Sequence, residues 1–168
     1  MRRTTLAMLG ATLAVLAASC DAPPPAPAAS ESADATPENA PGIVLGEARV
    51  QLPVVSGRPG AAYFTLTQAS GPPRKLVAVA VAMAGRAEIH RTAKDGAMST
   101  MKPVSEVPIA SGETVRFEPG GYHVMLFDLD PRLRFEKSAR LTLTFDNGDK
   151  AAVTAPVTTV AEAMGDMG

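Results

Sequence analysis

The stretch that decides the fold reads RLTLTF at residues 140–145, followed by DNGD at 146–149 and KAAVTAPV at 150–157. Apolar and polar side chains alternate in the first segment, so the apolar ones share one face of a strand. The Asn-Gly pair in the middle favours a tight hairpin turn, after which residues 150–157 form the partner strand. This region therefore predicts an antiparallel β-hairpin with one buried face.

The same pattern extends through the rest of the domain. Short apolar segments are separated by clusters of Gly, Pro, Ser and Asp, and none shows a long helical period. The remaining strands are expected at residues 43–50, 61–67, 75–82, 86–91, 97–104, 114–117 and 122–129, with a polar hairpin loop at 93–96 and a loop through Pro131 and Glu136. Short strands at regular spacing predict an all-β fold, a Greek-key β-sandwich or barrel.

Composition excludes several functional classes. The chain has 16 basic and 17 acidic residues, so it lacks the basic footprint of a nucleic-acid-binding protein. Its single cysteine permits neither an internal disulfide nor a dithiol redox centre, and the domain has no thiolate for a blue-copper site. No Ser-His-Asp cluster and no carboxylate-rich metal site can be picked out. We therefore expect a protein that is not an enzyme.

The N-terminus indicates export. Residues 1–19 read as a bacterial signal, because Arg2 and Arg3 precede an apolar run that is too short to span a membrane. Cys20 follows this run in a lipobox-like context and is expected to become the lipid-modified first residue of the mature chain. The alternative is a signal cut nearby that removes the thiol or leaves it unpaired. The predicted location is periplasmic, with the protein held to the membrane by its lipid anchor.

The next segment reads as a tether. Residues 20–41 are rich in Pro and Ala and contain no aromatic residue, so they cannot bury enough apolar surface to become ordered. We expect an extended, disordered linker, a folded domain at residues 42–158 and a flexible tail at 159–168.

Both histidines of the chain stand at short spacings from methionines. Ten residues separate His90 from Met101, 21 separate Met101 from His123, and one separates His123 from Met125. In a strand, His123 and Met125 would point to the same face. Imidazole and thioether form a soft, neutral ligand pair, and thioethers select Cu(I) over zinc, calcium or magnesium. The pattern predicts one Cu(I) ion bound by His90, Met101, His123 and Met125.

Each of these residues also has an ordinary structural interpretation. A methionine in a β-domain is usually core filler, and a histidine beside a glycine turn is usually a surface residue. The joint spacing favours the metal site. Met98, Met164 and Met167 stay outside the primary ligand set; the last two could hold a second copper ion loosely or belong to a frayed end.

At these residues the chain resembles the periplasmic copper-A chaperone family, PCuAC. The matching segments are AAYFTLT at 61–67, EIH at 88–90, MKPV at 101–104, PGGYHVML at 119–126 and LTLTF at 141–145, within a resemblance that covers roughly residues 42–157. The resemblance implies a cupredoxin-like sandwich and the same four ligands. Two positions depart from the family pattern: Thr92 stands where relatives often have a methionine, and Met98 is shifted by one residue.

Three functions follow from this reading. The first is a copper chaperone that, by resemblance, delivers Cu(I) to the copper-A subunit of a respiratory cytochrome c oxidase or to another periplasmic copper protein. The second is a copper buffer or tolerance protein with the same site and no dedicated acceptor. The third is a β-sandwich interaction module that binds no metal.

Overall fold

The computed structural model describes residues 40–95, 98–160 and 162. The expected export signal at 1–19, Cys20 and the tether as far as residue 39 lie outside the described residues, as do Met164 and Met167. No helix within the described part has the length and apolar character needed to cross a membrane.

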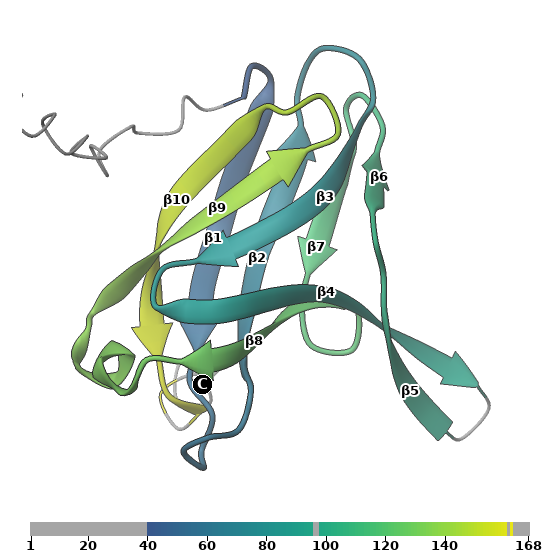
Figure 1. Cartoon of the computed structure of the whole chain (residues 1–168). Coiled ribbons are helices and arrows are strands. Elements are labelled where there is room, and N and C mark those ends of the chain that lie inside the picture. The colour runs from purple at the N-terminus through teal and green to yellow at the C-terminus, as the bar shows by residue number, and fades with distance from the viewer. Residues whose placement is uncertain (1–39, 96–97, 161, 163–168) are drawn as a thin grey trace, which may run out of the picture. The chain divides into compact units, whose positions relative to one another are not determined.

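The expectation of an all-β fold is confirmed. The described residues form ten strands and one short 3₁₀ helix (Figure 1). The strands are β1 (Ile43–Gln51), β2 (Gly60–Gln68), β3 (Arg74–Val81), β4 (Ala84–Asp95), β5 (Met98–Pro103), β6 (Val107–Ile109), β7 (Thr114–Phe117), β8 (Tyr122–Leu129), β9 (Ser138–Phe145) and β10 (Lys150–Thr158); the helix is η1 (Pro131–Phe135).

The strands make one continuous sheet that folds back on itself. Its order is β5-β4-β8-β7-β2-β1-β10-β9-β3-β6, and many neighbours in space are distant in sequence. The parallel pair β1–β10 joins the two layers. In Figure 1, β9 and β3 cross in front of β1 and β2, as in a Greek-key sandwich.

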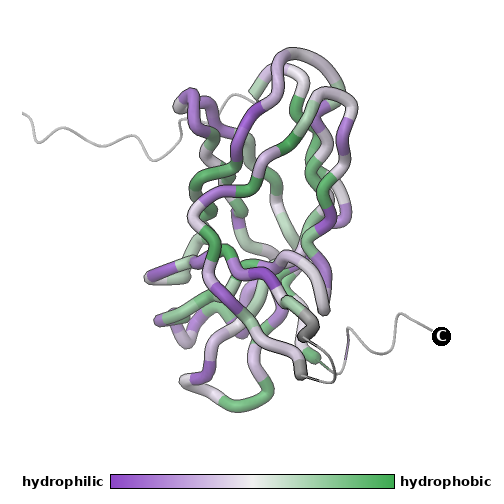
Figure 2. The backbone as a smooth tube through the Cα atoms, turned by 90° about the vertical axis from the view of Figure 1, so that its right-hand side faces the viewer, coloured by the Kyte–Doolittle hydropathy of each residue, from purple (hydrophilic) through white to green (hydrophobic). Residues whose placement is uncertain are grey.

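Alternating side chains build the core between the layers. Ala62, Phe64 and Leu66 of β2 are buried, and so are Leu141 and Leu143 of β9. The ring of Phe64 stacks on that of Phe117 with centroids 4.2 Å apart. Hydrophobic and hydrophilic positions alternate along the strands in Figure 2. Each strand of this kind leaves a second, outward face free for other chemistry.

Four local features differ from the sequence expectations. The hairpin after β9 has a three-residue loop, in which the Phe145 N–H donates a hydrogen bond to the Asp149 carbonyl. The tight turn expected at Asn147-Gly148 needs a positive φ at both residues, and only Gly148 has one. Strand β4 continues through the expected loop to Asp95. The short strand β6 and the helix η1, which Asp130 caps through its side chain, were not predicted.

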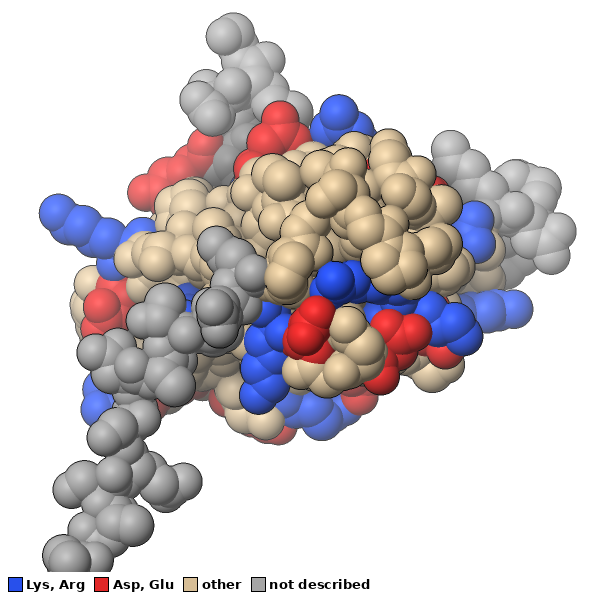
Figure 3. Space-filling view, turned by 90° about the horizontal axis from the view of Figure 1, so that it is seen from above, with Lys and Arg blue, Asp and Glu red and all other residues tan. Residues whose placement is uncertain are grey.

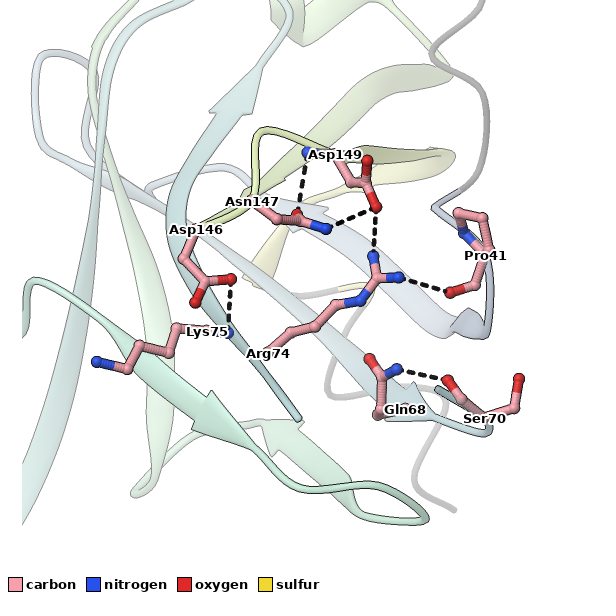
Figure 4. Close-up of polar contacts among 8 residues, drawn as sticks. All are labelled: Pro41, Gln68, Ser70, Arg74, Lys75, Asp146, Asn147 and Asp149. Carbon is pink, nitrogen blue, oxygen red and sulfur yellow. Dashed lines mark hydrogen bonds and ion pairs between the residues drawn. The ribbon is translucent and has the colours of Figure 1, made fainter. Parts of the chain in front are cut away.

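The upper end in Figure 1 is fixed by a buried arginine. Figure 4 shows the Arg74 guanidinium between Asp149 and the carbonyl of Pro41, at 2.7 and 3.1 Å. Asn147 donates a hydrogen bond to the same Asp149 carboxylate oxygen. Seen from above, basic and acidic side chains interleave, without one large field of a single sign (Figure 3).

Candidate metal centre

The two histidines lie directly opposite each other on neighbouring strands. β4 and β8 pair antiparallel, and the register places His90 against His123. Directly opposed residues of an antiparallel pair point to the same side of the sheet. The two rings are 5.9 Å apart between centroids and inclined by 40°. Residues 33 positions apart in sequence thus meet on one face.

The two predicted methionine ligands lie on the same face. Met125 follows His123 by two positions on β8, and Met101 of β5 lies opposite Thr92, two positions after His90 on β4. By strand alternation, all four candidate side chains belong to the outward face of the sheet, while Val124 between the β8 candidates is fully buried in the core. Of Met98 only the backbone is described; it pairs with Asp95 at the start of β5.

Three of the four candidates line one cavity. Met101, His123 and Met125 surround a cavity of about 250 Å³ together with Tyr63, segments of β1 and β2, and Val160. Exposure differs sharply within the set: His123 is 7% exposed, whereas Met101 is 61% exposed. A larger neighbouring cavity of about 480 Å³, between the loop at 52–59 and η1, contains none of the four candidates.

Hydrogen bonds fix the orientation of both imidazoles. His123 Nδ1 lies 3.1 Å from the carbonyl oxygen of Gly121, which can only accept, so His123 carries its proton on Nδ1 and leaves Nε2 with a free lone pair. His90 Nε2 lies 3.1 Å from Glu88 Oε2. His90 Nδ1 is buried and has no hydrogen-bond partner among the described residues.

Tyr63 of β2 lines the cavity, and an arginine lies over its ring. Tyr63 lies beneath the guanidinium of Arg49, which is 4.7 Å from the ring centroid. Burial raises the pKa of the Tyr63 hydroxyl, and the nearby Arg49 charge opposes part of this rise. Tyr63 therefore stays a neutral hydroxyl at neutral pH.

The donor set fits a soft monovalent metal ion. It consists of two imidazoles and two thioether sulfurs on one face of the sheet; Met101, His123 and Met125 line the cavity, and His90 lies beside it, opposite His123. Within the described part of the chain, no group of three His, Cys, Asp or Glu is arranged to hold a metal ion. Thioether sulfur and imidazole together suit Cu(I), for which neutral soft ligands are preferred.

Sequence reasoning missed three residues of this region. Glu88 was quoted only as part of the EIH segment, although its spacing of two from His90 places it on the same face of a strand. The Gly121 carbonyl contacts His123, and Tyr63 lines the cavity from a strand distant in sequence. Strand alternation could have found Glu88, and the Gly121 contact is a local one, two residues before His123. Only the position of Tyr63 depends on tertiary packing.

The family described as "Putative lipoprotein LpqE-like" matches residues 43–157. The chain belongs to the LpqE-like family.

Other relatives of this LpqE-like chain carry little functional description. The uncharacterized protein RP573 of Rickettsia prowazekii is 32% identical over 98 residues, covering 58% of this chain and 54% of the relative. The putative lipoprotein Lxx21020 of Leifsonia xyli subsp. xyli is 31% identical over 83 residues, covering 49% and 50%. The chain thus spans about half the length of the curated relatives it matches.

Solved structures confirm the PCuAC-type, cupredoxin-like fold of this LpqE-like protein. The solution structure of CuI-DR1885 from Deinococcus radiodurans is 35% identical, with a TM-score of 0.58, covering 77% of this chain and 86% of that one. The copper-bound PCuAC domain of PmoF2 is 19% identical, with a TM-score of 0.58 and coverage of 70% and 93%; it supports the fold alone. The resemblance to the PCuAC family is confirmed.

Proposed function

We propose that this protein is an extracytoplasmic copper chaperone that binds Cu(I) through His90, Met101, His123 and Met125. The observation that carries the proposal is the convergence of the four side chains on one face of three neighbouring strands. Two rings 5.9 Å apart and three residues around one cavity form a donor set of soft neutral ligands. Copper is the cargo of such a protein, which acts as a carrier and catalyses no reaction.

The uneven exposure of the ligands supports release as well as capture. His123 is almost buried and oriented by a backbone carbonyl, so it is a fixed anchor for the ion. Met101, 61% exposed on the projecting β4–β5 hairpin, is open to a partner (Figure 1). An acceptor could replace the outer thioether first and the inner imidazoles later, so that copper never becomes free.

The surroundings of the cavity suit contact with an acceptor protein. The loop at 52–59 contributes Val54 and Val55, which are 82% and 61% exposed, and Figure 2 shows a hydrophobic stretch at the lower end of the molecule. Exposed apolar residues beside a site are typical of protein-contact surfaces. The acceptor that the resemblance implies is the copper-A subunit of a respiratory oxidase, or another periplasmic copper protein.

The family description as a putative lipoprotein supports the expected anchor. A lipid on Cys20 would hold the domain at the membrane, with residues 20–39 as its tether and residues 1–19 removed as the export signal. The expected tether end at residue 41 is shortened because Ala40 is buried in the core and Pro41 accepts a hydrogen bond from Arg74. Mass spectrometry of the mature protein tests this: we expect a mass that begins at Cys20 with lipid added.

Cu(I) binding is tested by competition with a coloured Cu(I) chelator under reducing, oxygen-free conditions. We expect one Cu(I) per chain, and loss of binding in His123→Ala. If wild type fails to withdraw Cu(I) from the chelator, the metal-free interaction module becomes the better description.

Delivery and buffering share one site, so a second experiment separates them. Copper-loaded protein is mixed with an apo copper-A domain in the presence of excess chelator. Direct handover predicts that the copper-A domain fills faster than the chelator removes metal. Full interception by the chelator, together with normal oxidase activity in a deletion strain at low copper, would instead favour the copper buffer.

A further inference from the structure

A row of charged side chains leads to the first histidine of the site. Arg86, Glu88 and His90 alternate along β4 and therefore share its outward face. Glu88 Oε2 lies 3.1 Å from His90 Nε2, while Glu88 Oε1 pairs with the Arg86 guanidinium. The carboxylate is thus held from both sides.

Arg86 is itself fixed from the neighbouring strand. Phe127 of β8 lies directly opposite Arg86, and the guanidinium carbon is 4.0 Å from its ring centroid. A guanidinium stacked on an aromatic face loses much of its freedom to move. Phe127 thus contacts Arg86, Arg86 pairs with Glu88, and Glu88 contacts His90.

These contacts decide which nitrogen of His90 carries the proton. A carboxylate only accepts hydrogen bonds, so the His90 proton is on Nε2. The remaining lone pair belongs to Nδ1, which is buried and without a hydrogen-bond partner among the described residues. A buried nitrogen left unsatisfied is costly, and a metal ion would satisfy it. His123 has the opposite arrangement, with Nδ1 held by the Gly121 carbonyl.

We infer that Glu88 is a positioning residue that holds His90 for Cu(I) binding through Nδ1, while His123 binds through Nε2. The inference rests on the proposed copper-binding function. Metal-binding histidines commonly donate their second ring N–H to a carboxylate or a backbone carbonyl, which fixes the ring and increases its basicity. Here Glu88 supplies the carboxylate for one imidazole and Gly121 the carbonyl for the other.

The test is nitrogen NMR on the full chain labelled with ¹⁵N, at about pH 8, where an unperturbed imidazole is neutral. In the metal-free protein we expect a hydrogen-bonded N–H at His90 Nε2 and at His123 Nδ1. Loading with Ag(I), a spin-half substitute for Cu(I), should produce silver–nitrogen couplings at His90 Nδ1 and His123 Nε2.

Substitutions at Glu88 then separate positioning from general stability. Glu88→Ala should lose the protected His90 N–H, spread the silver coupling over both His90 nitrogens, and weaken Cu(I) binding about 10–100-fold. Glu88→Gln keeps an acceptor oxygen, so it should retain the Nδ1 coupling and lose less than about 10-fold. The matched control is Glu106→Ala, which removes a carboxylate paired with Lys75 on the other layer and should change neither readout.

Silver coupling at His90 Nε2 in the wild type would overturn the inference, as would a Glu88→Ala protein with unchanged coupling and affinity. A wild type that binds neither metal would refute the proposed function instead. The metal-free spectrum would then still decide whether Glu88 holds the His90 proton, so the two failures can be told apart.

Discussion

The substitution Met101→Leu separates metal binding from folding. Leucine has nearly the volume of methionine but no sulfur, so the change removes one candidate ligand and little else. Met101 is 61% exposed and lies within β5 opposite Thr92, outside the core cluster. At such a site the free energy of unfolding should change by no more than about 0.5 kcal/mol.

The expected loss of copper affinity is much larger. Losing a hydrogen-bond partner of a metal ligand typically weakens binding about 10–100-fold, and removing a ligand itself should exceed this. We therefore expect the Cu(I) dissociation constant of Met101→Leu to rise by more than about 100-fold, which corresponds to about 2.7 kcal/mol. Chelator competition measures the affinity, and chemical denaturation of the metal-free protein measures the stability.

A methionine away from the cavity provides the control. Met83 lies at the turn between β3 and β4 and packs partly against the core, so Met83→Leu repeats the same chemical change elsewhere. It should leave Cu(I) affinity unchanged and cost less than about 1.5 kcal/mol of stability. Wild-type affinity in Met101→Leu, or equal losses in the two variants, would refute Met101 as a ligand.

Three further substitutions test other parts of the structure. His123→Ala should abolish Cu(I) binding and lower the free energy of unfolding by about 1–3 kcal/mol in denaturant titrations, because a nearly buried, hydrogen-bonded ring is lost. Asp149→Ala leaves the buried Arg74 without its ion-pair partner; we expect about 1–3 kcal/mol of destabilisation, reduced because Asp149 is 38% exposed, with Cu(I) affinity unchanged at this distant end. Hydrogen bonds from Arg132 lower the pKa of Asp130 from 3.8 to about 2, so this carboxylate stabilises the fold above about pH 4 and the contribution is lost as pH falls towards 2. Asp130→Asn should therefore unfold with a weaker pH dependence in that window, measured by thermal melts at a series of pH values; an unchanged dependence would contradict the assignment.

Local patterns in the sequence predict most of the strands. The alternation in residues 140–145 predicts the buried face of β9, and Leu141, Leu143 and Phe145 are indeed almost fully buried. Elements too short to show a period escape this kind of reasoning. β6 has only three residues and η1 only five, and both are defined by their contacts with the rest of the domain.

The candidate site depends on information that local patterns lack. Spacing suggested that His123 and Met125 share a face, and the structure places them so. Strands β4 and β8 pair although they are far apart in sequence. No local signal in residues 86–91 predicts that His90 will lie opposite His123. The family resemblance supplied this part of the prediction, because it links residues that only the folded chain brings together.

The site's geometry ultimately rests on the packing of the core beneath it. Inward and outward side chains alternate along residues 123–126 of β8. Val124 and Leu126 are fully buried in the core, and His123 and Met125 face outward. A slip of one residue in this strand would exchange the two sets, placing an imidazole and a thioether in the core and two aliphatic side chains at the cavity. The free energy lost by exposing Val124 and Leu126 opposes such a slip. The same hydrophobic burial that stabilises the sandwich therefore also fixes the register at which His123 lies opposite His90.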